Sequence, residues 1–202
     1  HPTLTEAVSW IANQSSLIFL GFFLLAILFL LRERFWISYL FFGLSLLSKE
    51  TALGGIFIIP FICLIDSEWR EKINFRKVLI NSYPFVLIGL VYFYVHYKIL
   101  GALGDHALRG SFWQNLLLAP TVFLKYLTLS VWPVNLLLDY SNYPLPLSLG
   151  DPRVIFGILM FGLFAVLLWL GFKKSWLGFS LGIVWFVAFL LPVLQFIPFQ
   201  DI

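Results

Sequence analysis

The chain has 202 residues, of which 61% are hydrophobic and only 11% are charged, with a formal net charge of +3. Soluble domains are about half apolar and about a quarter charged, so this composition excludes an ordinary soluble enzyme or binding domain. The basic residues have another use, the orientation of membrane spans, so we expect no nucleic-acid partner.

Four long runs lack Asp, Glu, Lys and Arg: residues 7–31, 78–97, 154–172 and 175–200. Uncharged apolar runs of about 18 residues or more are candidate membrane spans. The sequence therefore predicts an all-α fold, a polytopic bundle of transmembrane helices in a lipid bilayer, without an internal repeat. Since the chain begins at His1 and its only methionine is Met160, we interpret residues 1–202 as a single transmembrane domain, a fragment of a longer polypeptide.

Residues 1–15 precede the first apolar helix and are predicted to lie on the outer, extracytoplasmic side. This orientation lets three basic clusters face the cytoplasm, as the positive-inside rule requires. The clusters are Arg32 with Arg34, then Arg70, Lys72, Arg76 and Lys77, then Lys173 with Lys174.

Glu6 also lies in this first segment. A lone acid there is more often a solvated residue at a helix start than a catalytic group, so Glu6 is only a reserve candidate for the catalytic acid or base.

The first span is predicted at about residues 16–31, and a helical hairpin follows over residues 35–65. Lys49 and Glu50 divide this hairpin into uncharged arms of 14 and 15 residues. Such arms reach only about 21–23 Å as helices, whereas the hydrocarbon core is about 30 Å thick. We therefore expect the polar turn at residues 48–51 to lie below the outer surface, where a charge must face protein or a wet cavity.

Lys49 is the most informative residue of this turn, because one helix ends there and another begins. A helix N-terminus together with a lysine forms a site for an anion such as a lipid phosphate. The alternative is a local pair between Lys49 and Glu50, with Ser48 as the cap of the second helix. The residues alone leave both interpretations open, and Glu50 is a second reserve candidate for an acid or base.

The next span, at about residues 78–98, is predicted to return to the outer side. His96 and Lys98 lie at its outer end, where long polar side chains normally reach toward the interface. The three histidines of the chain are too scattered to predict a metal site, and Cys63 is expected to be a buried apolar residue.

The run at residues 113–133 contains Pro120 and Lys125 and ends at a proline. We predict an interfacial or re-entrant segment here, because a full crossing would place the last basic cluster outside. The last two spans are predicted at about residues 154–172 and 176–199. The prediction is thus about six spans and one segment that does not cross.

Four short motifs occur in order along the chain. They are HPTLTEAVSWI at residues 1–11, LLSKETA at 46–52, WPVNLLLDY at 132–140 and LPV at 191–193. In this order they resemble the membrane part of the GT-C glycosyltransferases, especially the O-mannosyltransferase-like branch that carries C-terminal tetratricopeptide repeats. The resemblance covers essentially the whole chain.

The resemblance implies an enzyme that transfers a sugar from a polyprenyl-phosphate carrier to a protein or glycan hydroxyl on the extracytoplasmic side. The lipid-linked donor would be its substrate, and no cofactor is certain. Lys49, as the lysine of the Leu-Ser-Lys turn, would face the carrier phosphate, with His96 and Lys98 as further phosphate-binding candidates. In the family an acid of the first outer loop acts as the base; we expect this loop upstream of His1 and the repeats downstream of Ile202.

The chain departs from the family at Asn13-Gln14 and at His96 and Lys98, where related sequences often have arginine. Two other classes of function stay open. A lipid or solute transporter would show inverted repeats or broken helices near mid-membrane, and a scaffold without catalysis would bury Lys49 and Glu50 against each other. In each case we expect a multi-pass protein of the bacterial inner membrane or the endoplasmic reticulum.

Overall fold

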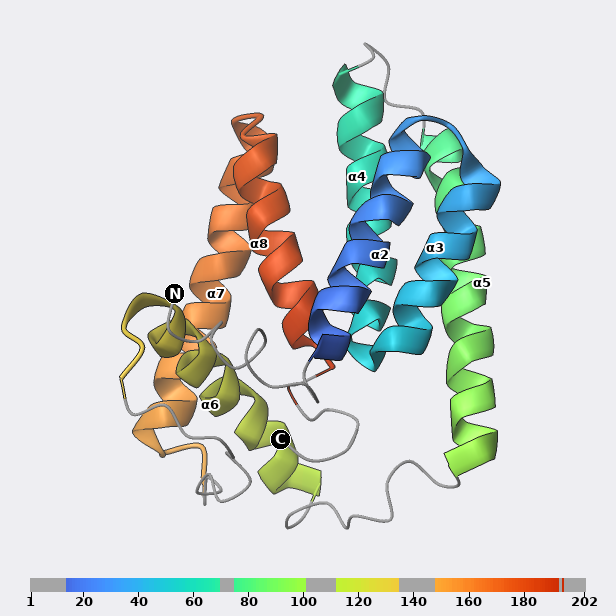
Figure 1. Ribbon diagram of the computed structural model, residues 1–202. Coiled ribbons are helices and arrows are strands. Elements are labelled where there is room, and N and C mark those ends of the chain that lie inside the picture. The colour runs from blue at the N-terminus through green and yellow to red at the C-terminus, as the bar shows by residue number, and fades with distance from the viewer. Residues whose placement is uncertain (1–13, 70–74, 101–111, 135–147, 193, 195–202) are drawn as a thin grey trace.

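The computed structural model describes residues 14–69, 75–100, 112–134, 148–192 and 194 (Figure 1). All regular structure in these residues is helical, in agreement with the predicted all-α fold. The elements are α2 (Gln14–Leu31), α3 (Phe35–Ser48), the 3₁₀ helix η3 (Glu50–Gly54), α4 (Gly55–Trp69), α5 (Phe75–Leu100), α6 (Phe112–Val131), α7 (Pro152–Lys173) and α8 (Leu177–Leu190).

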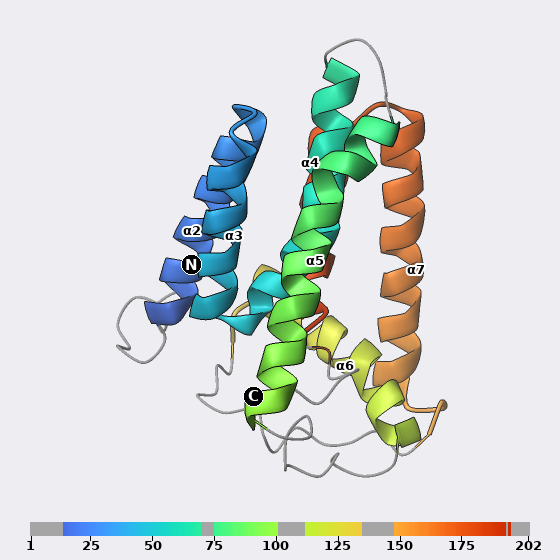
Figure 2. The ribbon, with the colours of Figure 1, turned by 90° about the vertical axis from the view of Figure 1, so that its right-hand side faces the viewer.

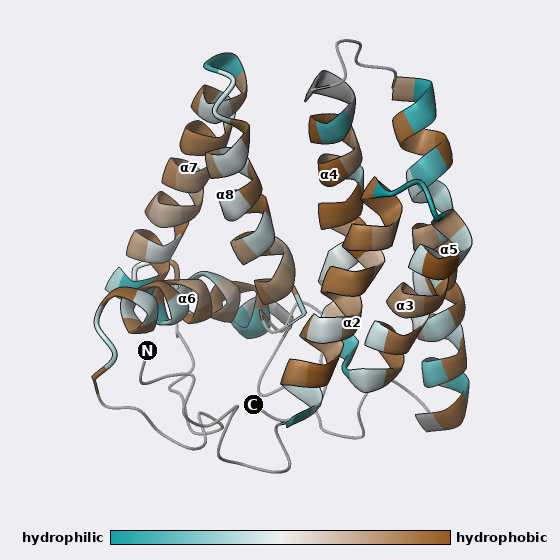
Figure 3. Ribbon diagram, turned by 45° about the horizontal axis from the view of Figure 1, so that its top comes forward, coloured by the Kyte–Doolittle hydropathy of each residue, from teal (hydrophilic) through white to brown (hydrophobic). Residues whose placement is uncertain are grey.

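Three helices are long and apolar enough to cross a membrane, namely α2, α5 over Phe75–His96, and α7. These helices make the chain a membrane protein, as the composition predicts. The helices α3 and α8 are apolar but have only 14 residues each, and α4 has 15. Figure 3 shows that hydrophilic residues gather mainly at the turns and helix ends. The count of about six spans stays a prediction.

The helices α2 and α3 form a hairpin whose turn closes with two backbone hydrogen bonds. The Arg34 amide donates to the Phe29 carbonyl at 2.9 Å, and the Glu33 amide donates to the Leu30 carbonyl at 2.9 Å. Glu33 has a φ of 58°. One residue in the left-handed region and this pair of bonds are the Schellman motif, which satisfies the last carbonyls of a helix.

A second hairpin, made by α7 and α8, uses the same turn. The Trp176 amide donates to the Gly171 carbonyl at 2.8 Å, the Ser175 amide donates to the Phe172 carbonyl at 3.2 Å, and Ser175 has a φ of 55°. Figures 1 and 2 show that the first helix of each hairpin runs toward the same end of the bundle. This repeated geometry was not predicted from the residues, because the two hairpins share few residues.

Five aromatic rings hold the first hairpin against α5 and α8. Phe23 of α2 meets Phe42, Trp185 and Phe189 with ring centroids 6.4, 5.5 and 5.3 Å away. Phe42 in turn meets Phe85 of α5 edge to face at 5.3 Å. Phe23, Phe42 and Phe85 are fully buried. This cluster is the centre of the larger hydrophobic core.

The α8 helix is shorter than predicted. The sequence predicted a span over residues 176–199, whereas the helix ends at Leu190, and residues 195–202 lie outside the described part. Pro192 has no amide hydrogen, so it cannot donate to the Ala188 carbonyl four residues earlier. A Cβ added to Gly54 of η3 would lie 2.4 Å from this carbonyl oxygen. The end of α8 therefore packs directly on the backbone of η3.

The α6 helix lies across the ends of α7 and α8 rather than alongside them (Figures 1 and 3). Pro120 lies inside it, and the Pro120 backbone is so close to α7 that only a glycine, Gly157, fits there. Phe123 stacks on Phe161 of α7 with ring centroids 3.9 Å apart. The helix is not among the three that are apolar enough to cross a membrane. Its depth in the bilayer stays a prediction.

Candidate functional site

The predicted break between the two arms of residues 35–65 occurs at Lys49. The α3 helix ends at Ser48, and Lys49 has an extended backbone with φ −161° and ψ 135°. Its amide donates to the Ser45 carbonyl at 3.1 Å, and its carbonyl accepts from the Ala52 amide at 3.1 Å. Lys49 thus ends α3 and also precedes η3, which continues directly into α4.

Ser48 does not cap the second helix, so that prediction is wrong. Its hydroxyl donates to the Leu44 carbonyl at 2.8 Å, within α3. A serine inside the last turn of a helix commonly bonds back to the carbonyl four residues earlier. The residue that precedes η3 is Lys49, and no side chain caps that helix.

The Lys49 ammonium group is held by the start of α2. Its Nζ donates to the Ser16 Oγ at 2.6 Å, in a half-buried position. Lys49 therefore has a partner on another helix, as well as the neighbours in its own turn. The bond fixes the position of the charge at the end of the bundle opposite the α2–α3 turn (Figure 1). Sequence reasoning missed Ser16, whose only signal was a hydroxyl at the start of an apolar helix.

Glu50 lies next to Lys49 in the same turn and is half-buried. The α5 helix passes close to the residues that follow, because a Cβ added to Gly89 would meet the side chains of Leu53 and Ile56.

On α5, the Tyr92 ring contacts the His96 ring, with centroids 5.6 Å apart. Residues four apart lie on one face of a helix. His96 thus lies on the same face of α5 as Tyr92, a residue that the sequence analysis did not single out and that packs against the larger hydrophobic core.

Lys98 lies on a different face of α5. Its Nζ lies 5.8 Å from the centroid of the exposed Tyr94 ring. Positions two apart point to nearly opposite faces of a helix, so Lys98 and His96 do not share one face. Glu6 and the residues before Gln14 lie outside the described part of the chain.

No protein-family model, curated protein or solved structure matches this chain. Its function must therefore be argued from its own residues and their geometry.

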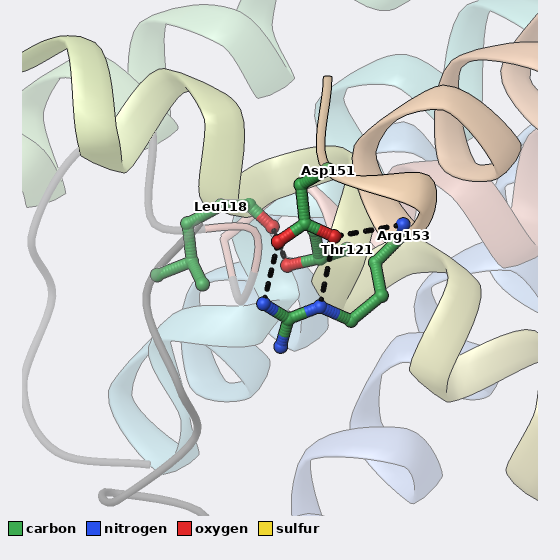
Figure 4. Close-up of polar contacts among 4 residues, drawn as sticks. All are labelled: Leu118, Thr121, Asp151 and Arg153. Atoms are coloured by element: carbon green, nitrogen blue, oxygen red, sulfur yellow. Dashed lines mark hydrogen bonds and ion pairs between the residues drawn. The ribbon is translucent and has the colours of Figure 1, made fainter. Parts of the chain in front are cut away.

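A separate polar group marks the start of α7 (Figure 4). The Asp151 carboxylate accepts from the Arg153 amide at 2.9 Å and from the Arg153 guanidinium, whose Nη2 lies 2.6 Å away. These hydrogen bonds hold the pKa of Asp151 below its ordinary value. On α6, the Thr121 hydroxyl donates to the Leu118 carbonyl at 2.7 Å. Asp151 is the residue that caps α7, so we interpret this group as structural.

Metal ligands are not gathered anywhere in the described ranges. No group of three or more His, Cys, Asp or Glu side chains there is placed to hold a metal ion. Cys63 is buried in α4. The turn at Lys49 is therefore the strongest candidate site in the described part of the chain.

Proposed function

We propose that this chain is the membrane domain of a glycosyltransferase of the GT-C type. The enzyme would move a sugar from a polyprenyl-phosphate carrier to a protein or glycan hydroxyl on the extracytoplasmic side. The observation that supports this proposal is the position of the Lys49 ammonium, held by Ser16 at 2.6 Å where α3 breaks into η3.

A cation at this place suits the chemistry of the transfer. When the bond between the sugar and the carrier breaks, negative charge develops on the phosphate, and a fixed ammonium group stabilises that charge. An ammonium oriented in advance by a hydroxyl needs little rearrangement as the reaction proceeds. Ser16 is thus a positioning residue, and Lys49 is the phosphate-binding residue.

Two neighbours of Lys49 add polar groups for a ligand. The Thr51 Oγ1 is buried and makes no hydrogen bond within the described part of the chain. Buried hydroxyls normally have a partner, and an oxygen of the bound donor would supply it. Glu50 remains a reserve candidate for the base that deprotonates the acceptor hydroxyl. The base expected from the family resemblance would lie before His1.

The proposed topology has about six spans, with α6 at the outer interface and the α2–α3 and α7–α8 turns in the cytoplasm. The protein would lie in the bacterial inner membrane or the endoplasmic reticulum. This arrangement keeps all three basic clusters on the cytoplasmic side.

A transporter is the second candidate, because a helix is interrupted at Lys49. Transporters commonly bind substrate where helices are interrupted. However, the two similar hairpins of the described bundle run in the same direction and are not inverted (Figure 1). A transporter would move the lipid carrier across the bilayer without breaking its bond to the sugar, so an assay of sugar transfer separates the two functions.

The test is Lys49→Ala in the complete protein, assayed in membranes with polyprenyl-phosphate mannose and an acceptor peptide. A hydrogen bond to a charged group contributes about 1.5–3 kcal/mol, so transfer should fall roughly ten- to hundredfold. Lys49→Arg should keep part of the activity, because the charge remains although its geometry changes.

The matched control is Lys125→Ala, which removes the same charge from α6 and should leave transfer nearly unchanged. Ser16→Ala should lower transfer severalfold, less than Lys49→Ala, because the charge remains but loses its orientation. Normal transfer by Lys49→Ala, or equal losses in the Lys49 and Lys125 variants, would show that the phosphate role is wrong.

A further inference from the structure

Pro192 follows the end of α8 and belongs to the LPV motif, to which the proposed function gives no role. A proline lacks an amide hydrogen, and its ring pushes the carbonyl group four residues earlier away from the helix axis. Here that group is the Ala188 carbonyl. The Leu191 amide donates to the Val187 carbonyl at 3.0 Å, so it does not satisfy Ala188 either. The last turn of α8 therefore contains a carbonyl group that its own helix does not satisfy.

The Ala188 carbonyl points instead at the backbone of η3. Ala188 is 2% exposed, and Gly54 is buried as well. A Cβ added to Gly54 would overlap the Ala188 oxygen and would lie 2.8 Å from the carbonyl carbon. Gly54 thus directs a Cα–H bond at this carbonyl, a contact that recurs where helices pack closely. A side chain at position 54 would push α8 and η3 apart.

The next residue of α8 packs on α2. The Phe189 ring meets Phe19 edge to face, with ring centroids 5.6 Å apart, and it meets Phe23 with centroids 5.3 Å apart. Ser16 lies three residues before Phe19, and residues three apart are neighbours on one side of a helix. Phe189 therefore holds the part of α2 from which Ser16 meets Lys49.

Lys49 is linked to Gly54 by a short series of backbone hydrogen bonds. The Ala52 amide donates to the Lys49 carbonyl at 3.1 Å, which closes a 3₁₀ turn. The Gly55 amide then donates to the carbonyls of Ala52 and Leu53. A segment bonded in this way moves as one unit, so the position of Gly54 sets the position of the Lys49 backbone.

We propose that Pro192 is a positioning residue for Lys49. It sets the last turn of α8 so that the Ala188 carbonyl holds η3 and the Phe189 ring holds α2. These two segments bring together the Lys49 ammonium and the Ser16 hydroxyl, which meet at 2.6 Å. The effect of Pro192 on sugar transfer rests on the proposed function, whereas its effect on the position of η3 does not.

The first test is Pro192→Ala in the complete protein, because alanine restores an amide donor for the Ala188 carbonyl. The carbonyl should then turn back to the helix axis and leave Gly54. Hydrogen exchange of the η3 amides, measured by mass spectrometry in nanodiscs, should become roughly fivefold faster or more. The thermal midpoint should not fall, since alanine is far more favourable than proline in a helix. A merely structural role would instead lower stability together with activity.

The second test follows sugar transfer. Pro192→Ala should raise the KM for polyprenyl-phosphate mannose roughly three- to tenfold, because a remote change that displaces a binding group weakens its contact. In a Lys49→Ala background the same change should have no further effect, since two residues that act through one contact are not additive.

Pro84→Ala is the matched control for both tests. Pro84 lies inside α5, and its replacement also restores an amide donor, in this case for the Ile80 carbonyl. Ile80 lies nine residues before Gly89, the point at which α5 meets Leu53 of η3. Exchange of the η3 amides and the KM should therefore stay as in the unmodified protein. Gly54→Ala breaks the Ala188 contact from the other side and should speed exchange of the same amides.

Unchanged exchange in Pro192→Ala, or an equal increase in Pro84→Ala, would overturn the proposal. A full further loss of transfer when Pro192→Ala is added to Lys49→Ala would also overturn it. Normal transfer by Lys49→Ala alone would contradict the proposed function instead, and the exchange rates of the η3 amides would still decide whether Pro192 positions the turn.

Discussion

The hairpins α2–α3 and α7–α8 are built alike but serve the bundle differently. Each closes with the same turn, and each second helix has 14 residues. The α3 helix then opens at Lys49, where a charge is held by Ser16. The α8 helix instead places its Ala188 carbonyl on Gly54, within the segment that follows Lys49. One hairpin presents the candidate site and the other supports it. The difference between them therefore lies in the residues at the helix ends and not in the shape of the hairpin.

The prediction with the largest expected effect is that the two turns lie on the same side of the membrane. Cysteines introduced as Glu33→Cys and Ser175→Cys should both be shielded from an impermeant maleimide in intact cells. A cysteine at Gly150, before the start of α7, should react. The native Cys63 is buried and should give little background. Labelling at one turn but not the other would show that the hairpins do not share one orientation.

The next effect concerns the support that α8 gives to η3. In Gly54→Ala the new Cβ would lie 2.4 Å from the Ala188 oxygen and 2.8 Å from its carbonyl carbon. Backbone must move to relieve this overlap, so the variant should lose about 1–3 kcal/mol of stability.

Gly182→Ala is the control for this change, because no atom lies within 4 Å of the added Cβ outside its own helix backbone. Alanine favours a helix over glycine by about 0.5–1 kcal/mol, so this variant should be as stable as the original or more stable. Thermal unfolding in detergent micelles measures both. A tolerated Gly54→Ala would mean that α8 does not pack tightly on η3.

A smaller effect distinguishes two equivalent serines, each five residues after the central residue of its turn. The Ser38 hydroxyl is buried and donates to the Ala26 carbonyl at 2.6 Å. The Ser180 hydroxyl is buried and makes no hydrogen bond within the described residues. Ser38→Ala should therefore cost about 1 kcal/mol, whereas Ser180→Ala should be neutral or stabilising. Equal costs would indicate that Ser180 has a partner.

The smallest expected effect is a pH-dependent change in stability, and it concerns the residues that fix the first helix of each hairpin. The α2 helix is fixed through Ser16, whereas α7 is capped by Asp151, whose pKa is lowered by its hydrogen bonds to Arg153. Because the pKa of Asp151 is lower in the folded protein, its ionised carboxylate stabilises the folded state. This stabilisation is fully present when the pH is above the ordinary pKa of about 3.9, and it is lost as the pH falls through the lowered pKa. Asp151→Asn should thus lower the thermal midpoint at neutral pH, and the difference should narrow on acidification. A difference independent of pH would contradict this role.

The positions of the helices could be predicted because charge is so rare in this chain. Lys49 and Glu50 are the only charged residues between positions 35 and 65, so the break there was visible in the sequence. The end of α8 was missed because the prediction counted only charges and took no account of Pro192. This proline lacks an amide hydrogen and interrupts the backbone hydrogen bonds of the helix, although the Leu194 amide beyond it still donates to the Leu190 carbonyl at 2.9 Å. The turns were missed because Glu33 and Ser175 are not the glycine or asparagine that usually indicates a positive φ.

The candidate site was only partly predictable. Lys49 could be found because a charge flanked by short apolar arms is conspicuous. Its partner could not, because Ser16 lies 33 residues away in sequence and meets Lys49 only through the packing of α2 on α3. Tyr92 was similarly hidden, although its spacing of four from His96 placed both on one face of α5. The contacts between helices decide these pairs, and periodicity within one helix does not reveal them.

The cluster of rings around Phe23 has a consequence for how the bundle responds to heat. In water, burying such rings would give unfolding a large positive change in heat capacity. In a bilayer, separated helices keep their rings among lipid tails, so this driving force between helices is absent. What remains is contact between ring edges and faces, which contributes about 0.5–1.5 kcal/mol per pair. Separation of the helices within the membrane should therefore change the heat capacity little, so the free energy that holds the bundle together should fall almost linearly with temperature instead of passing through a maximum.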